Sequence, residues 1–321
     1  MPHVVADIGE AGVIARVREA VSRAWPNAPH VRIGLGDDAA VLEMDGACAV
    51  ATDSLVEGVH FRREWVSAQA VGSKLAARNF ADIVAMGARP RALLLALAMP
   101  ADTTLEWLDG FINGVVAETM RAGAVLVGGD TSVAPFVMAS ATAIGDACGT
   151  SVTRAGARAG DVVAVSGLCG AAASGLALLS AGLSEPASAI AAYGSPRPDY
   201  SLALRAADTA NSMIDCSDGL VNDLGHIARA SGCDLRLRAA AIPRSDAAVQ
   251  AASVLGRTSD EWVLTGGEDH MFLATFPSAA QVPEGFTVIG DAVPGPGQVW
   301  IDDQVWAGVA GYQHFADTPR T

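Results

Sequence analysis

The chain has 321 residues, of which 51% are hydrophobic, so it is long enough for two domains with cores of their own and too apolar to be disordered. It has 35 acidic and 21 basic residues and a formal net charge of −14, which argues against nucleic acid and anionic membranes as its main partners. An acidic balance is also ordinary for a soluble protein, so a functional argument depends on where the acids lie.

Cysteine usage and the N-terminus favour a soluble, cytoplasmic protein. The five cysteines form no Cys-x-x-Cys pair, and their odd number favours buried, reduced thiols over disulfides or structural zinc. The start of the chain lacks the basic residues and long apolar core of a signal peptide, and the most apolar stretch, residues 92–99, is too short to cross a bilayer.

The first half of the chain alternates predicted helices with predicted strands. Helical spacing of apolar residues predicts helices over 10–25, 67–86 and 105–122, and short apolar runs predict strands over 41–42, 47–52, 91–99, 124–127 and 136–144. Ser67 is placed to cap the second helix and Gly87 to end it.

A polar, glycine-rich stretch at residues 145–160 predicts a boundary, giving domains of 1–148 and 149–321. The second half repeats the alternation, with strands expected at 161–166, 212–214, 233–238 and 272–276 and helices at 171–181, 202–207 and 220–230. Residues 184–198 are expected to be a loose connection. The turn 166–170 either offers backbone N–H groups to an anion or is a plain tight turn, which we favour. The expected class is α/β (α+β) in two domains.

Acidic residues recur at strand ends or in glycine turns in six places. They are Gly36-Asp37-Asp38, Thr52-Asp53-Ser54, Asn79-Phe80-Ala81-Asp82, Gly128-Gly129-Asp130-Thr131, Asp215-Cys216-Ser217-Asp218-Gly219 and Gly266-Gly267-Glu268-Asp269. Six such groups in a chain poor in basic residues indicate several divalent metal ions with a phosphorylated ligand. Asp53 and Asp130 each follow an apolar run, and we expect parallel strands to bring them to one edge of a sheet.

Each acid also has a simpler explanation. Asp37 and Asp38 are typical of a β-turn, Asp82 has the spacing of an ion pair with Arg78 on one helix, and Asp218 fits helix capping better than Asp215 does. His60, taken alone, is an ordinary surface histidine. The sequence has no phosphate-binding loop ending in Gly-Lys-Ser/Thr and none of the protein-kinase loops, so a bound nucleotide would be held by metal ions and backbone.

In their order along the chain, these segments resemble the thiamine-monophosphate kinase family. The most specific run is Thr52-Asp53-Ser54-Leu55-Val56-Glu57-Gly58-Val59-His60-Phe61, and the other acidic groups and the terminal Gly311-Tyr312-Gln313-His314-Phe315 complete the set. The resemblance covers nearly the whole chain. It implies a fold like that of aminoimidazole ribonucleotide synthetase, in which the N-terminal domains of a homodimer share a β-barrel.

The resemblance also implies ATP-dependent phosphorylation of thiamine monophosphate to thiamine diphosphate with several Mg²⁺ ions. The implied metal ligands are Asp37, Thr52, Asp53, Asp82, Asp130, Asp215 and Asp218. The implied ATP contacts are Gly129, Asp130, Arg154 and Ser217, and the implied substrate contacts are His60, Glu268 and Tyr312. Transfer is expected to be direct and in line, without a covalent nucleophile or a general base.

The chain departs from the family in three places. The family often has Trp at the position of Tyr312, and Tyr-Glu where this chain has His270-Met271. Family members have a Tyr in the helix that corresponds to residues 105–122, and this chain has none there. The alternatives are another ATP-dependent enzyme of the same superfamily, a metal-dependent phosphohydrolase and a non-catalytic nucleotide-binding regulator.

Overall fold

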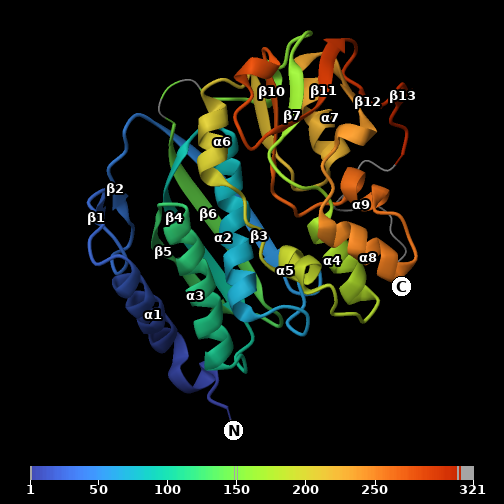
Figure 1. Ribbon diagram of the computed structural model, residues 1–321. Coiled ribbons are helices and arrows are strands. Elements are labelled where there is room, and N and C mark those ends of the chain that lie inside the picture. The colour runs from blue at the N-terminus through green and yellow to red at the C-terminus, as the bar shows by residue number, and fades with distance from the viewer. Residues whose placement is uncertain (1, 148, 150, 309–310, 312–321) are drawn as a thin grey trace. The chain divides into compact units, whose positions relative to one another are not determined.

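The computed structural model describes residues 2–147, 149, 151–308 and 311, and it divides into two compact units, Met1–Ser151 and Val152–Thr321 (Figure 1). Each unit contains its own sheet and helices, which makes the protein a mixed α/β molecule. No helix in the described part of the chain is long and apolar enough to cross a membrane.

The first unit contains a four-stranded sheet in the order β3-β6-β4-β5. The strands are β3 (Ala47–Val56), β4 (Arg89–Met99), β5 (Val125–Val133) and β6 (Met138–Ala147). β6 is antiparallel to both β3 and β4, whereas β4 and β5 are parallel. β3 and β5 are therefore the two edges of this sheet.

Two helices, α2 (Ala68–Ala85) and α3 (Leu105–Arg121), pack together and cover one face of the sheet (Figure 1). The hydroxyl oxygens of Ser67 and Thr104 accept hydrogen bonds from the backbone N–H groups of Ala70 and Trp107, and these bonds cap the two helices. The predicted cap at Ser67 is confirmed.

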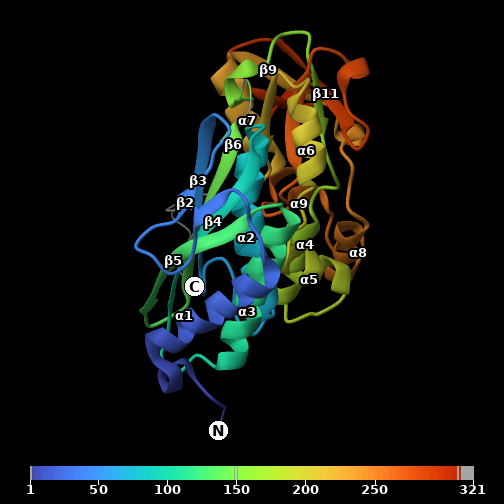
Figure 2. The same cartoon turned by 90° about the vertical axis from the view of Figure 1, so that its left-hand side faces the viewer.

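The other face of the sheet is more open. Alternate residues such as Leu55 and Ala139 are buried against the helices, whereas Val50 and Met138, which point the other way, are 63% and 42% exposed. One end of this open face packs against the segment that follows α1 (Val5–Ala24) and includes the hairpin β1 (Val31–Ile33) and β2 (Val41–Leu42). Figure 2 shows α1 running beside α3.

The second unit is built on a seven-stranded sheet in the order β13-β12-β9-β11-β7-β10-β8. The strands are β7 (Val162–Val165), β8 (Ser212–Asp215), β9 (Cys233–Leu237), β10 (Phe272–Phe276), β11 (Thr287–Pro294), β12 (Val299–Ile301) and β13 (Gln304–Val305). Neighbouring strands are antiparallel except for β9 and β12.

Helices and short 3₁₀ turns complete the second unit. The helices are α4 (Ala171–Ser180), α5 (Ala187–Gly194), α6 (Tyr200–Ala207), α7 (Leu220–Ser231), α8 (Asp246–Leu255) and α9 (Asp260–Thr265), and the 3₁₀ turns are η1 (Arg154–Gly156), η2 (Ala239–Ala241) and η3 (Ala279–Gln281). Leu220, Leu224 and Ile227 of α7 belong to the same buried cluster as Leu235 and Leu273 of the sheet, so α7 is anchored in the core.

Three expectations about the elements are wrong. β3 and β5 are longer than predicted, so Asp53 and Asp130 lie inside strands rather than after them. β3 is antiparallel to its neighbour, so the ends of β3 and β5 do not meet as the ends of parallel strands would. The connection over 184–198 contains a helix, α5.

Candidate active site

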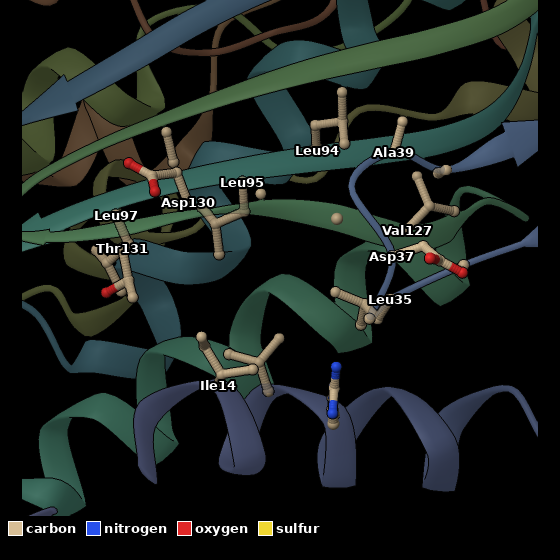
Figure 3. A pocket seen from close by; sticks show the side chains of 18 of the residues that line it. Ile14, Leu35, Asp37, Ala39, Leu94, Leu95, Leu97, Val127, Asp130 and Thr131 are labelled. Carbon is tan, nitrogen blue, oxygen red and sulfur yellow. The ribbon is translucent and has the colours of Figure 1, made fainter. Parts of the chain in front are cut away.

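A cavity of about 720 Å³ lies in the first unit, between α1, the loop over 34–40 and the open face of β4, β5 and β6. Figure 3 shows Asp37 on the loop and Asp130 on the strand, among the apolar side chains of Ile14, Leu94 and Val127. Three of the residues predicted to bind metal or ATP, Asp37, Gly129 and Asp130, therefore line one cavity.

An irregularity in β5 places Asp130 on the open face. Leu126 pairs with Leu93 of β4, but Gly128 pairs with the next residue, Leu94, so Val127 is one extra residue in β5. Asp130 consequently lies beside Ala96, which points away from the helices.

Gly129 has two reasons to be glycine. Its φ of 154° lies in a region that side chains disfavour, and a Cβ there would be 1.8 Å from the carbonyl oxygen of Leu95. The backbones of β4 and β5 thus lie very close to each other beside Asp130.

The Asp37 loop is tightly turned as well. Gly36 has a φ of 123°, and a Cβ on it would be 2.6 Å from a guanidinium nitrogen of Arg18 on α1. Asp37 and Asp38 both line the cavity.

Asp53 lies on the opposite, helix-covered face of the sheet. Its carboxylate pairs with Arg78 of α2 over 3.0 Å, and its backbone N–H donates to the side-chain oxygen of Asn79, also over 3.0 Å. The adjacent Thr52 points the other way, where its hydroxyl is 3.2 Å from that of Thr142. Asp82 follows Arg78 by four residues and Asn79 by three, so helical spacing places it on the same side of α2.

The acids of the first unit are thus divided between two faces of the sheet. Asp53 and Asp130 lie on edge strands about three strand spacings apart, roughly 14 Å, and point to opposite sides. Within the residues that the structure describes, no three His, Cys, Asp or Glu side chains converge closely enough to hold a metal ion. The expectation that Asp53 and Asp130 meet at one sheet edge of a single chain is wrong.

His60 lies in the turn after β3, and its tautomer is set by the backbone. The N–H of Val56 donates to Nδ1 of His60 over 3.1 Å, so the neutral ring carries its proton on Nε2. Nε2 can therefore act as a hydrogen-bond donor.

In the second unit, the loop from Asp215 to Gly219 is shaped by a buried carboxylate. Asp223 of α7 accepts hydrogen bonds from the backbone N–H groups of Asp218 and Gly219 over 3.0 and 3.2 Å. Burial and the charge of Asp215 raise the pKa of Asp223 to about 7. Asp215 itself is only 4% exposed.

A second loop, Gly266 to His270, runs beside the first. The backbone N–H groups of Glu268 and His270 donate to the carbonyl oxygens of Ser217 and Cys216 over 2.8 and 3.0 Å. Glu268 and His270 have φ values of 71° and 51°, which non-glycine residues rarely adopt. The two loops thus bring together three predicted site residues, Asp215, Ser217 and Glu268.

His270 also belongs to this site, although no role for it was predicted from the sequence. Its Nδ1 is 3.2 Å from a carboxylate oxygen of Asp215, and its Nε2 is 3.9 Å from one of Glu268. Burial alone would lower the pKa of His270, but contact with these two carboxylates outweighs burial and raises the pKa to about 9. The only sequence signal was the departure from the family's Tyr.

The turn over 166–170 does direct backbone N–H groups at an anion, but that anion belongs to the protein. The carboxylate of Asp269 accepts from the N–H groups of Gly170 and Ala172 over 2.6 and 2.8 Å. Asp269 is therefore a cap for α4. Burial, the largest influence, raises its pKa to about 6.

The remaining predicted residues lie at other points of the second unit. Arg154 is exposed in η1, and its carbonyl oxygen accepts from Ser231 over 2.9 Å. A Cβ on Gly311 would be 2.0 Å from the carbonyl oxygen of Asp218, so the chain passes directly against the Asp215–Gly219 loop there. Tyr312 lies outside the described residues.

The first unit is similar to a known family of domains. Residues 36–147 match the family described as AIR synthase related protein, N-terminal domain. The first unit therefore belongs to the class of proteins built on that domain.

Relatives matched over the whole length are more specific. Thiamine-monophosphate kinase from Mycobacterium tuberculosis is 42% identical over 97% of this chain and 92% of its own. The crystal structure of thiamine-monophosphate kinase from Stenotrophomonas maltophilia K279a is 32% identical with a TM-score of 0.81, over 93% of this chain and 98% of that one. AaThiL complexed with AMPPCP and TMP is 28% identical with a TM-score of 0.80, over 96% and 98% of the two chains. The chain belongs to the thiamine-monophosphate kinase family.

Proposed function

We propose that this protein transfers the γ-phosphoryl group of ATP to thiamine monophosphate, forming thiamine diphosphate. The observation that carries the proposal is the whole-length similarity to thiamine-monophosphate kinases, one of whose structural relatives holds AMPPCP together with TMP. AMPPCP is an ATP analogue, so that relative binds both partners of the proposed reaction.

Direct, in-line transfer fits the chemistry of these substrates. The phosphate of thiamine monophosphate is largely ionised near neutral pH, so it needs no strong base to become a nucleophile. One of its oxygens attacks the γ-phosphorus while the bond to ADP breaks, and no phosphorylated enzyme forms.

The acids and Thr52 supply only oxygen donors, which suit Mg²⁺. We assign Asp37, Thr52, Asp53, Asp82, Asp130, Asp215 and Asp218 as the residues that hold it. Bound Mg²⁺ would offset the repulsion between the two anionic substrates. Two observations support this assignment. Asp37 and Asp130 line one cavity, and Asp215 is buried in the second unit.

Other residues of the chain would bind the substrates. Gly129, Arg154 and Ser217 would contact ATP. His60 would donate from Nε2 to the phosphate of thiamine monophosphate, while Glu268 and Tyr312 would hold the rest of that molecule.

We also propose a homodimer in which the four-stranded sheets of two copies close into a shared β-barrel. The exposed Val50 and Met138 on the open face support it, because closure would cover them. Closure would also pair the edge strands, and β3 carries Asp53 while β5 carries Asp130. Asp53 of one copy would then lie on the strand next to the one that carries Asp130 of the other copy.

The two units would have different roles in the proposed reaction. Residues 1–148 would carry the dimer contact and most of the metal and ATP site, and residues 149–321 would complete the nucleotide and substrate site. Free thiols buried in the second unit, Cys169, Cys216 and Cys233, support a cytoplasmic location.

Product analysis tests the proposed reaction. Thiamine diphosphate should form only when ATP, thiamine monophosphate and Mg²⁺ are all present, and Asp130→Asn should reduce turnover by about 100-fold or more, because it removes one charge at nearly constant shape. Phosphate released from thiamine monophosphate without ATP would instead indicate a phosphohydrolase. Wild-type turnover in Asp130→Asn would refute the assignment of Asp130.

A further inference from the structure

The imidazole of His270 lies between two carboxylates to which the proposed function gives different tasks. Nδ1 is 3.2 Å from Oδ2 of Asp215, assigned to the metal, and Nε2 is 3.9 Å from Oε2 of Glu268, assigned to thiamine monophosphate. The histidine side chain is 1% exposed, whereas that of Glu268 is 25% exposed and can meet a ligand.

The backbone around His270 explains why the ring is held there. Hydrogen bonds to Cys216 and Ser217 join the two loops, and Glu268 and His270 keep left-handed φ values that cost about 1 kcal/mol or more each. Such a conformation persists only where the surroundings enforce it, and the ring is buried, so it has little freedom to turn away from either carboxylate.

We propose that His270 is a positioning residue that acts on the two carboxylates through opposite ring nitrogens, an inference that rests on the proposed function. The carboxylate of Asp215 can only accept, so Nδ1 of His270 donates to Oδ2 and leaves Oδ1 to face the cation. Nε2 orients Glu268 for thiamine monophosphate. One ring therefore controls cation binding and substrate binding through separate contacts.

Two amide substitutions separate these contacts. In His270→Asn the side-chain nitrogen takes a place near Nδ1, and in His270→Gln it reaches the place of Nε2. Asn also tolerates the left-handed backbone well. The full-length variants would be compared in two binding measurements without ATP: Mn²⁺ binding from the electron paramagnetic resonance signal of free Mn²⁺, and thiamine monophosphate binding by calorimetry.

The expected result is a crossed pattern. His270→Asn should keep Mn²⁺ binding within about twofold and weaken thiamine monophosphate binding about tenfold, because it loses only the group facing Glu268. His270→Gln should do the reverse. His3→Gln, at a side chain that is 87% exposed, is the matched control and should change neither.

Equal changes in both measurements for both variants, or no change in either, would overturn the inference. Wild-type protein that neither binds nor phosphorylates thiamine monophosphate would instead overturn the proposed function. Nitrogen-15 spectra of wild-type histidine rings give a readout that needs no variant to fold. Mg²⁺ should shift mainly the Nδ1 signal of His270, and thiamine monophosphate mainly its Nε2 signal; identical shifts with both would count against the proposal.

Discussion

The carboxylate of Asp234 in β9 shows how a buried charge is held in this fold. It accepts hydrogen bonds from the backbone N–H groups of Gly297 and Gln298 over 3.0 and 2.8 Å and from the indole N–H of Trp300 over 2.9 Å. Burial opposes ionisation, but these three donors outweigh it and hold the pKa of Asp234 below its ordinary value.

A lowered pKa in the folded state means that Asp234 stabilises the fold above its ordinary pKa and that this stabilisation is lost as pH falls through the folded value. Asp234→Asn should therefore lower the free energy of unfolding by about 1–3 kcal/mol near pH 7, with a smaller loss near pH 3. Urea denaturation at the two pH values measures the difference. Asp303→Asn, at an exposed position, is the control, and an equal loss at both pH values for Asp234→Asn would contradict the argument.

Single residues with local roles could be predicted, and those with long-range roles could not. Ser67 was predicted as a helix cap because a cap acts within one turn. His270 and Asp234 each depend on partners more than 50 residues away, at Asp215 and Trp300, and no spacing in the sequence indicates such contacts.

At the scale of elements, α2 and α3 approach each other at two glycines. A Cβ on Gly72 would be 2.1 Å from the carbonyl oxygen of Phe111, and one on Gly114 would be 2.0 Å from that of Gln69. Both obstructing atoms belong to the backbone, so the helices would have to move apart to admit a methyl group.

Gly114→Ala should therefore lower the free energy of unfolding by about 2 kcal/mol or more, despite the better helix propensity of alanine. Gly110→Ala on the same helix is the matched control. Its Cβ would lie 3.1 Å from the methyl group of Ala68, so a small shift accommodates it and the gain in propensity offsets the crowding. Thermal and urea unfolding of the two variants should differ clearly; equal stabilities would mean that the helix pair adjusts freely.

Elements marked by a clear apolar run were predicted, whereas several elements of the second unit were missed. β10 was predicted with its observed bounds because a short apolar run stands between polar residues. The alanine-rich helices α5 and α8 were missed, and so was β11, which contains Gly290 and Pro294, residues that obscure a strand pattern. The described structure therefore contains more helices and strands than the pattern of apolar residues predicts.

At the scale of the whole molecule, the sequence predicted two α/β parts and the family. It did not predict that the acids would be divided between the two faces of a sheet. Asp53 and Asp130 face opposite sides of their sheet because of strand order and register, which the sequence does not display. In the proposed dimer the two acids lie on neighbouring strands of different copies, so the site would require a second copy.

Mixing two inactive variants tests that requirement. Asp53→Asn and Asp130→Asn should each be inactive alone, but subunits exchanged between them should regain about a quarter of wild-type turnover, because half of a random mixture is mixed dimers with one intact site. Activity would be measured after unfolding and refolding the two variants together. No recovery, with mixed dimers confirmed by mass, would show that each chain builds its own site.

The extra residue Val127 in β5 has a consequence for how this region tolerates change. If Val127 instead paired with Leu94 in a regular ladder, Asp130 would pair with Leu97 and point into the helix-covered face, since a one-residue slip reverses every side chain that follows. The chemistry of Asp130 thus depends on the length of the strand as much as on the identity of the acid. Inserting one residue between Val127 and Gly128 would turn the carboxylate out of the cavity while leaving Gly129-Asp130 unaltered in the sequence, so at this point a change in residue count is more damaging than most changes in residue type.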